Sequence, residues 1–543
     1  MLNRKNNIQH LINNSFDLLI IGGGITGAGI ALDAASRGLK TALVEKLDFA
    51  YGTSSRSTKL IHGGLRYLKQ LEFALVKEVG SERAIVHKLA PHLVVPEKML
   101  LPLYEQRGLG YWLTSIGLKI YDWLAGVKPE DQRKMLTRQQ TLNHEPLLKS
   151  DDVRGGAVYA EYRTDDARLT IEIMKLASTK GACVCNYMQV DDFIYEQNKI
   201  CGVKASNSIT KESLLIKATM VVNATGPWVD NLRWINNSRY GKSLHLTKGV
   251  HIVVPFHRLP VHQAIYFDVS DGRMIFAIPR GRITYIGTTD TDYKGDKDNV
   301  IATKEDVLYL LNATNETFPS ILLTLADVES SWAGLRPLIH EEGKSASELS
   351  RKDEIFESET GLISIAGGKL TGYRKMAERV VDKVIDLHFK DQELEECKTS
   401  GLTLPGGDFQ NYSEVKMLET ELAARLGELN LRGNEATYLA HLYGHQANII
   451  VDYLKKNMTE NPECDLMLAQ AWFSMHYEMS IYPLDFIIRR SGLLFFNRPK
   501  IVRWLNPVID FFAKELRWSQ EEHTLQLALV THALEQVVNF ESQ

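Results

Sequence analysis

The hydrophobic pattern near the start of the chain predicts one βαβ unit. A short, mostly apolar run at 16–21 and another at 41–44 suit parallel strands that are buried on both faces. Between them lie a glycine-rich turn and an alanine-rich stretch that predicts a helix. The order of strand, turn, helix and strand is typical of a parallel α/β domain.

Later segments follow a different period and predict a second sheet. The stretches GVHIVVPF, MIFAIPR and ITYIGTTD alternate like antiparallel strands, with turn residues between them. Two more apolar strands end abruptly, one at 224–226 (Ala-Thr-Gly) and one at 367–368 (Gly-Gly). The second of these precedes a long amphipathic helix that starts near Thr371, and the pattern after 410 is helical.

The first turn carries a phosphate-binding fingerprint. Gly22-x-Gly24-x-x-Gly27 joins the predicted strand and helix, and Glu45 ends the second strand. Glycines let a phosphate approach a helix N-terminus, where free N–H groups and the helix dipole favour an anion. Glu45 can accept hydrogen bonds from both ribose hydroxyls, which favours FAD or NAD over NADP. The alternative is a glycine-rich tight turn of an ordinary α/β domain.

The two later glycine turns favour FAD over NAD. A nicotinamide enzyme with one Rossmann domain needs neither turn, whereas the longer FAD needs additional support. The turn at 224–226 can back the adenosine side, and the helix after 367–368 can point its N-terminus at the pyrimidine edge of the flavin. A positive helix end stabilises the negative charge that gathers there in a reduced flavin. Each segment alone also fits an ordinary strand-turn-helix element.

A polar segment at 54–68, SSRSTKLIHGGLRYL, begins shortly after the second predicted strand. A chain that leaves this strand crosses the front of a bound cofactor. The hydroxyl groups that can bond phosphate or flavin heteroatoms belong to Thr53, Ser54, Ser55 and Ser57. The Gly-Gly pair at 63–64 lets the backbone approach a flat ring, and Arg66 and Tyr67 then project toward the group that is oxidised. The alternative is a solvated loop followed by an ordinary helix.

Composition narrows the class of protein. With 543 residues, 44% hydrophobic and 24% charged, the chain is long enough for two or three folded domains. Its net charge of -4 argues against a nucleic-acid-binding protein. Five scattered cysteines indicate reduced thiols in a cytoplasmic protein, and no signal peptide or membrane span is expected. Asp290 and Asp292 form a D-x-D pair, but no further ligand lies at suitable spacing, so no metal site is expected.

Seven stretches resemble the successive motifs of the FAD-dependent, respiratory glycerol-3-phosphate dehydrogenases. In chain order they are IGGGITGAGIALDAASRG, TSSRSTKLIHGGLRYL, VNATGPWV, KGVHIVVP, IGTTDTDYKGD, GLRPL and GGKLTGYRKMAE. They occur in family order between about residue 17 and about residue 380. The combination is specific to that family, whereas many flavoproteins share the first motif alone.

The resemblance implies oxidation of sn-glycerol 3-phosphate at C2 to dihydroxyacetone phosphate, with FAD as the hydride acceptor. Arginine suits the phosphate dianion because its planar fork donates bidentate, charge-assisted hydrogen bonds. His251 is the candidate base for the C2 hydroxyl, with a structural histidine beside the flavin as the alternative. Arg336 and Lys369 join it as catalytic candidates. The substrate-binding candidates are Arg66, Tyr67, Thr289, Asp290, Arg336, Arg351 and Lys369.

The motifs together also define the predicted cofactor site. Its residues belong to the first turn, the polar segment and the two later glycine turns. They are Gly22, Gly24, Thr26, Gly27, Glu45, Thr53, Ser54, Ser55, Ser57, Leu60, His62, Gly64, Ala224, Thr225, Gly226, Trp228, Gly367, Gly368, Lys369, Leu370 and Thr371.

We therefore expect an α/β fold with three parts. An FAD-binding Rossmann-like domain of the glutathione-reductase or D-amino-acid-oxidase type takes residues from about 1–90, 150–240 and 350–397. An antiparallel-sheet substrate domain takes residues from about 91–149 and 241–349. A linker at 398–410 leads to a C-terminal helical domain, 411–543.

The resemblance implies a quinone as electron acceptor and peripheral contact with the inner face of the cytoplasmic membrane. Two basic, aromatic stretches, 107–128 and 498–518, suit a lipid interface, although such helices more often pack on their own domain. The sequence leaves homo-oligomer formation open. The rival functions are a glycerol-3-phosphate oxidase that forms hydrogen peroxide, an amine or amino-acid oxidase of the same fold, and a flavin-binding regulatory protein without turnover.

Overall fold

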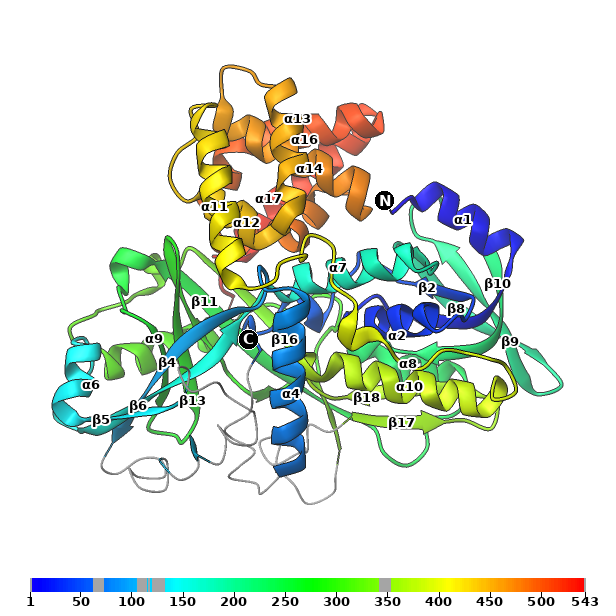
Figure 1. Ribbon diagram of the computed structural model, residues 1–543, viewed down its shortest axis with the longest axis horizontal. Coiled ribbons are helices and arrows are strands. Elements are labelled where there is room, and N and C mark those ends of the chain that lie inside the picture. The colour runs from blue at the N-terminus through cyan, green and yellow to red at the C-terminus, as the bar shows by residue number, and fades with distance from the viewer. Residues whose placement is uncertain are drawn as a thin grey trace.

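The computed structural model describes residues 2–61, 73–104, 115, 118–119, 132–340 and 353–541. Within this part of the chain, two sheets form the body of the molecule. The C-terminal helices, coloured yellow to red, lie together on one side of that body (Figure 1).

The first sheet is built around a parallel core. In hydrogen-bonding order its strands are β17 (Asp353–Glu357), β18 (Leu362–Gly367), β10 (Ser213–Asn223), β1 (Ser15–Ile21), β2 (Thr41–Val44) and β7 (Cys183–Cys185), and β9 (Lys199–Asn207) pairs with β10 and with β8 (Met188–Glu196). The run from β18 to β7 is parallel, whereas β17 is an antiparallel edge strand. All four residues of β2 are buried, which explains why its sequence is apolar throughout.

Helices cover one face of this sheet. In Figure 1, α2 (Ile25–Ser36), α7 (Asp166–Thr179) and α10 (Tyr373–His388) lie against it, and their apolar side chains form one core with those of β1 and β18. On the other face, Leu11 of α1 (Arg4–Asn13) packs with Phe16, Val190 and Val203. The sheet is therefore a buried layer, as a parallel sheet requires.

The second sheet is mainly antiparallel. In hydrogen-bonding order its strands are β15 (Thr291–Asp292), β11 (Leu244–Pro255), β14 (Ile283–Gly287), β13 (Met274–Arg280), β12 (Ala264–Asp268), β4 (Val95–Tyr104), β6 (Val153–Arg163) and β3 (Leu60–Ile61), with β16 (Ser330–Ile339) on β11 and β5 (Lys134–Thr137) on β6. The three alternating stretches in the sequence form β11, β13 and β14.

Alternation along β11 divides its side chains between two cores. Val250, Ile252 and Val254 face α9 (Lys304–Thr317), while Val253 packs with residues of the C-terminal helices. Because side chains alternate along a strand, His251 points to the same face as Val253. The second sheet is thus covered by α9 on one face and by the C-terminal region on the other.

The remaining helices are α4 (Phe73–Leu89), α6 (Arg138–His144), α8 (Val229–Ile235), α11 (Tyr412–Gly427), α12 (Glu435–Tyr443), α13 (Ala447–Lys456), α14 (Pro462–Glu478), α15 (Leu493–Phe496), α16 (Arg498–Leu516) and α17 (Gln520–Gln536). A π-helical turn, Asp485–Arg490, precedes α15. The predicted fold class, an α/β cofactor domain with an antiparallel sheet and C-terminal helices, is confirmed. Among the described residues, no helix combines the length and apolar character needed to cross a membrane.

Candidate active site

The first glycine turn brings a helix N-terminus close to strand β1. Gly24 is the N-cap of α2, and Gly22 has a φ of 114°, which favours glycine. A Cβ on Gly27 would lie 1.9 Å from the carbonyl oxygen of Gly22, so only glycine lets α2 pack this closely on the turn. Ser54 Oγ accepts a hydrogen bond from Ile25 N–H at 2.9 Å. The polar segment that follows β2 therefore touches the first turn of the helix.

Glu45 stands at the end of β2 beside this turn. Its carboxylate accepts hydrogen bonds from Gly23 N–H at 2.7 Å and from Leu47 N–H at 3.0 Å. Burial raises the pKa of Glu45 above its ordinary value. The carboxylate thus lies where a ribose hydroxyl would meet it when a dinucleotide phosphate sits at the end of α2.

A cavity of about 410 Å³ extends from the glycine turn. Most of the residues predicted to bind a cofactor line it, although they come from four separate stretches of chain. They are Gly22, Gly24, Thr26, Glu45, Thr53, Ser54, Ser57, Ala224, Thr225, Gly226, Trp228, Gly367, Gly368, Lys369 and Leu370. An elongated dinucleotide fits this donor set, because a helix N-terminus, hydroxyl groups and a buried carboxylate converge on one space.

Four predicted cofactor residues do not line the cavity. Gly27 serves the packing of α2 on its turn, and Thr371 is buried just before α10. The Ser55 hydroxyl points at the carbonyl oxygens of Tyr51 and Gly52, and Leu60 is buried in β3, packed with the side chains of the second sheet. His62 and Gly64 lie outside the described residues.

Sequence reasoning missed other residues of the cavity wall. Met188, Gln189 and Val190 reach it from the start of β8, and Lys46, Tyr51 and Gly52 reach it from the loop after β2. The three β8 residues carry no motif, because any half-buried strand has the same composition. Tyr51 and Gly52 directly precede the predicted hydroxyl segment, and this position in the sequence could have identified them as residues of the cavity wall.

His251 lies just behind the wall of this cavity. Its imidazole stacks on Trp332, with ring centroids 4.7 Å apart and planes 10° apart. Nε2 is 3.1 Å from Thr58 Oγ1, while Nδ1 is buried and has no hydrogen-bond partner among the described residues. Burial, followed by the positive charges of Arg336 and Lys59, holds the pKa of His251 well below its ordinary value. The ring is therefore neutral at pH 7.

Glycines on neighbouring strands make room for the polar side chains of this face. A Cβ on Gly287 would lie 2.1 Å from His251 Cδ2, and a Cβ on Gly249 would lie 2.5 Å from an Arg336 guanidinium nitrogen. Gly334, the cross-strand partner of Gly249, lies against the backbone of Arg56. The polar segment can therefore lie flat on this part of the second sheet.

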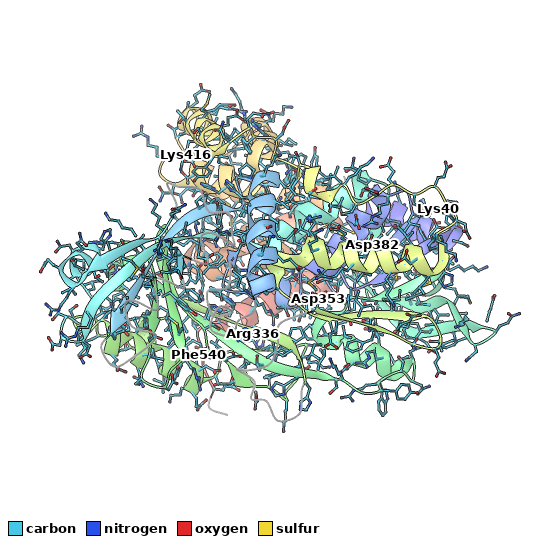
Figure 2. The ribbon with its side chains drawn as sticks, turned by 60° about the horizontal axis from the view of Figure 1, so that its bottom comes forward. Lys40, Arg336, Asp353, Asp382, Lys416 and Phe540 are labelled. Atoms are coloured by element: carbon cyan, nitrogen blue, oxygen red, sulfur yellow. The ribbon has the colours of Figure 1, made fainter. Side chains whose placement is uncertain are left out.

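Arg336 extends over Gly249 from β16. Its guanidinium donates to the Thr289 carbonyl at 3.1 Å, to Asp290 Oδ1 at 3.0 Å and to Thr288 Oγ1 at 2.9 Å. Figure 2 shows the labelled Arg336 near the middle of the molecule, between Asp353 and Phe540 in that view. These contacts orient the guanidinium from one side.

The side chains of Thr289 and Asp290, which were predicted to contact the substrate, contact other residues of the protein. The Thr289 hydroxyl is buried and accepts a hydrogen bond from Val250 N–H at 3.0 Å, so it holds β11 in place. Asp290 forms an ion pair with Arg336 at 3.0 Å. Both residues act on the position of Arg336, a role that the sequence motif alone does not distinguish from substrate contact.

The polar segment joins the cofactor cavity to this cluster. Ser57 lines the cavity, and its carbonyl oxygen accepts a hydrogen bond from Trp332 Nε1–H at 3.1 Å. The next residue, Thr58, contacts His251. Pro337, which follows Arg336, also lines the cavity, as does Lys369. Lys369 therefore lines the cavity itself, whereas His251 and Arg336 each lie next to a segment that lines it.

Three predicted substrate residues, Arg66, Tyr67 and Arg351, lie outside the described residues. The described residues contain no group of three or more His, Cys, Asp or Glu side chains arranged to hold a metal ion.

Comparison with known proteins decides the family. Residues 17–374 match the FAD dependent oxidoreductase family, and residues 397–523 match the C-terminal domain of alpha-glycerophosphate oxidase. The chain is 48% identical over 539 residues, 98% of its length and 97% of the relative, to the aerobic glycerol-3-phosphate dehydrogenase of Bacillus subtilis. The chain belongs to the family of FAD-dependent glycerol-3-phosphate dehydrogenases.

Two further family members agree. The aerobic glycerol-3-phosphate dehydrogenase of Staphylococcus aureus is 47% identical over 98% of this chain and 95% of that relative. The crystal structure of the glycerol-3-phosphate dehydrogenase from Bacillus halodurans, complexed with FAD, superposes with a TM-score of 0.85 at 45% identity, covering 100% of this chain and 99% of that one. The cofactor is FAD, as predicted.

Proposed function

We propose that this protein oxidises sn-glycerol 3-phosphate at C2 to dihydroxyacetone phosphate and passes the electrons to a membrane quinone. The observation that carries the proposal is the placement of Arg336 and His251 on one face of β16 and β11, next to Pro337 and the Ser57 segment that line the FAD cavity. A phosphate clamp and a proton acceptor are thereby combined at the edge of a flavin site.

Arg336 supplies the phosphate clamp. Its guanidinium is held by Thr288, Thr289 and Asp290, so little conformational freedom is lost when a substrate binds. A planar guanidinium recognises a phosphate through paired, charge-assisted hydrogen bonds. Lys369 adds a second cation on the cavity wall.

His251 takes the proton of the C2 hydroxyl. Its Nε2 is engaged by Thr58, so Nδ1 is the atom that receives the proton. A neutral imidazole is required for this role, and the lowered pKa keeps His251 neutral. FAD, when bound, supplies the acceptor for the hydride that leaves C2. Loss of this hydride and of the hydroxyl proton together yields the ketone.

Two parts of the proposal, the quinone acceptor and the peripheral membrane contact, rest on family membership and on the exposed surface of α16. The main apolar face of α16 is buried: Ile501, Val508, Ile509 and Phe512 are all core residues. Val502 and Leu516 remain exposed on the same helix, close in sequence to Arg503 and Arg517. This exposed strip is small, so we propose reversible contact with anionic lipid. The stretch 107–128 lies almost entirely outside the described residues.

Arg336→Ala tests the phosphate clamp. Loss of one partner of a charge-assisted bond in a partly desolvated site costs about 2 to 5 kcal/mol, or about 30-fold to several thousand-fold in rate. We expect anaerobic stopped-flow reduction of the flavin by sn-glycerol 3-phosphate to slow by a factor in that range. The poor reduction by unphosphorylated glycerol should change little.

Arg282→Ala is the matched control, because Arg282 forms an ion pair with Glu329 at the other end of β14. Equal losses with both substrates in Arg336→Ala would show that Arg336 supports the fold or the flavin instead. For the acceptor, oxygen consumption is compared with reduction of a soluble quinone analogue by the purified protein. Faster turnover with oxygen would favour the glycerol-3-phosphate oxidase alternative.

A further inference from the structure

The loop after β2 forms part of the cofactor cavity. Glu45, Lys46, Tyr51 and Gly52 line it, whereas Asp48, in the middle of the loop, points away and is fully buried. A buried carboxylate needs opposite charge and hydrogen bonds to remain ionised. The partners of Asp48 therefore determine where this loop can lie.

The main partners of Asp48 come from the C-terminal region. Arg490 donates to both carboxylate oxygens, from Nη1 to Oδ2 at 2.7 Å and from Nη2 to Oδ1 at 2.8 Å. Arg489 Nε–H also bonds Oδ2. Although burial opposes ionisation, these two guanidinium groups lower the pKa of Asp48 to about 2. Both arginines belong to the π-helical turn Asp485–Arg490, so this turn is fastened directly to the cofactor loop.

A neighbouring contact ties the same turn to another part of the cavity wall. Asp485 accepts a hydrogen bond from the Tyr187 hydroxyl at 2.6 Å. Tyr187 N–H in turn donates to the Leu47 carbonyl at 2.8 Å, and Met188, the next residue, lines the cavity. Two stretches of wall, the loop after β2 and the start of β8, therefore meet at the π-helical turn.

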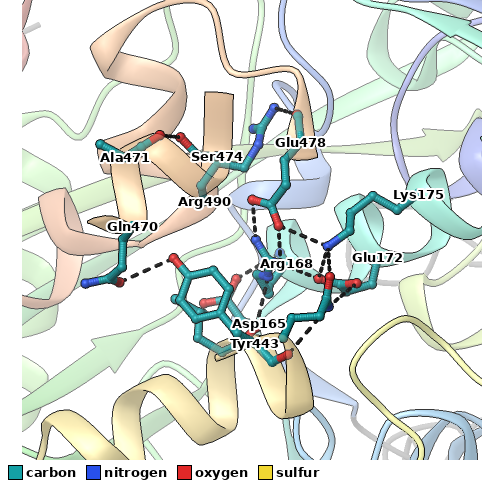
Figure 3. Close-up of polar contacts among 12 residues, drawn as sticks. Asp165, Arg168, Glu172, Lys175, Tyr443, Gln470, Ala471, Ser474, Glu478 and Arg490 are labelled. Atoms are coloured by element: carbon teal, nitrogen blue, oxygen red, sulfur yellow. Dashed lines mark hydrogen bonds and ion pairs between the residues drawn. The ribbon is translucent and has the colours of Figure 1, made fainter. Parts of the chain in front are cut away.

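A second buried ion cluster links the C-terminal helices to α7. In Figure 3, Arg168 of α7 forms ion pairs with Glu172 and Glu478. Lys175 forms ion pairs with the same two carboxylates. Arg490 joins this cluster by donating to the Glu478 carbonyl at 2.9 Å. At the start of α7, Asp166 accepts a hydrogen bond from Ser57 N–H at 2.9 Å, and Ser57 lines the cavity. Asp166, at the first turn of α7, thus holds the polar segment, whereas Lys175 lies farther along that helix and donates its hydrogen bonds to Glu172, Glu478 and Gln446.

The chain directly after the π-helical turn packs behind the catalytic histidine. The rings of Phe495 and Phe496 in α15 lie 5.4 and 5.8 Å from that of Trp332, on which His251 stacks. The Ser330 hydroxyl donates to the Phe495 carbonyl at 2.5 Å. A dozen residues, 485–496, therefore reach both the FAD loop and the support of His251.

We propose that segment 485–496 is a positioning element for the FAD site, acting chiefly through the bonds of Arg489 and Arg490 to Asp48. These residues do not line the cavity; they fix the loop that carries Glu45, Lys46 and Tyr51 against it. FAD affinity then depends on a part of the chain more than 400 positions away in sequence. By linkage, FAD must stabilise the contact between segment 485–496 and the loop to the same extent.

Two variants test the role of Asp48. Asp48→Asn keeps the shape of the side chain and removes its charge, and Arg490→Met removes the bidentate partner while keeping an unbranched apolar stem. FAD affinity of the apoprotein is measured by quenching of flavin fluorescence on titration. We expect each variant to raise the Kd for FAD by about 5-fold to 150-fold, the range of coupling between sites. The melting temperature of the apoprotein is recorded for each variant as a separate readout.

Lys175→Met is the matched control. Lys175 is almost fully buried and bonds Glu172, Glu478 and Gln446, so it joins the same two regions without reaching a cavity-lining segment. This variant should lower the melting temperature and leave the Kd for FAD at the wild-type value. An equal rise in Kd for the control and for Asp48→Asn would overturn the proposal, as would an unchanged Kd in both Asp48→Asn and Arg490→Met.

Hydrogen exchange in the wild-type protein provides a test that does not depend on a variant folding. FAD added to the apoprotein should slow amide exchange in residues 481–491, although none of them lines the cavity. The helix α13 should not respond, because its buried side chains pack within the core of the C-terminal helices. Identical exchange in 481–491 with and without FAD would contradict the coupling.

Discussion

Replacing Gly287 by alanine should displace His251 while leaving the FAD cavity intact. The added methyl group would lie 2.1 Å from His251 Cδ2 and 2.7 Å from Nε2. An ordinary contact begins at 3.4 Å, so the ring must retreat by about 1.3 Å, the difference between these two distances. Trp332 is stacked on the imidazole and restricts this retreat. Gly287 does not line the cavity, so the cofactor site is not changed directly.

The size of the effect follows from this displacement. Misplacement of a reacting group by about 1 Å costs about 100-fold in rate, because the near-attack geometry is lost. The bond between Nε2 and Thr58, now 3.1 Å, would be broken or bent as well. Overpacking of a core costs about 1 to 3 kcal/mol, less than the usual stability of a folded protein, so the variant should remain folded. We therefore expect flavin reduction to slow by about 100-fold with FAD fully bound.

Stopped-flow reduction of the flavin under anaerobic conditions measures this rate directly. Gly156→Ala is the matched control, because Gly156 lies in β6 of the same sheet and a Cβ there would lie 2.8 Å from Thr141 Oγ1 of α6, away from His251. The control should lose stability but keep the wild-type rate. If Gly287→Ala retains the wild-type rate and still binds FAD, the ring has no part in the rate-determining chemistry and His251 is not the base.

Three further predictions concern the cofactor, pH and lipid. Gly24→Val should abolish FAD retention, because its side chain would crowd Ser54 Oγ, 3.1 Å from the Cβ position, and enter the space of the pyrophosphate; a variant purified with full flavin absorbance would contradict this. Because the pKa of His251 is lowered, the base form persists to acidic pH, so flavin reduction should lose rate only below pH 6.5; a rise above pH 6.5 that His251→Asn abolishes would contradict the assignment. The protein should sediment with anionic vesicles at low salt and be partly released at high salt, whereas constant recovery in the supernatant would refute lipid contact.

Local sequence was sufficient to predict the strands and helices that surround the glycine turns. The strand at 41–44 has the predicted bounds, and the helix predicted near Thr371 begins with a helical turn at Leu370–Gly372 that continues into α10. These elements are predictable because the requirement for glycine, for apolar runs and for a terminal acid acts within one short stretch of chain. The alternation of apolar and polar residues in β11, β13 and β14 could be predicted for the same reason.

The sequence also identified residues whose roles only the structure distinguished. Thr289 and Asp290 were expected at a substrate pocket, yet one bonds to β11 and the other to Arg336. Ser55 was expected to bind the cofactor because it is one of several adjacent hydroxyls, but its own turn directs it to backbone carbonyls. A motif reports which residue types are present, whereas side-chain direction depends on the backbone conformation that packing selects.

By itself, the sequence determined the βαβ unit, its glycine turn and acid, and the alternating second sheet, since each depends on residues close together along the chain. It also determined the choice of FAD, because each of three glycine turns, although far apart in sequence, carries its own local pattern. Only the tertiary structure decided that Thr58 meets His251, that Gly287 makes room for its ring, and that Arg490 holds Asp48. The last pair is separated by 442 positions. Contacts of this kind have no local pattern, because they arise when buried charges and rings are forced to find partners in a close-packed interior.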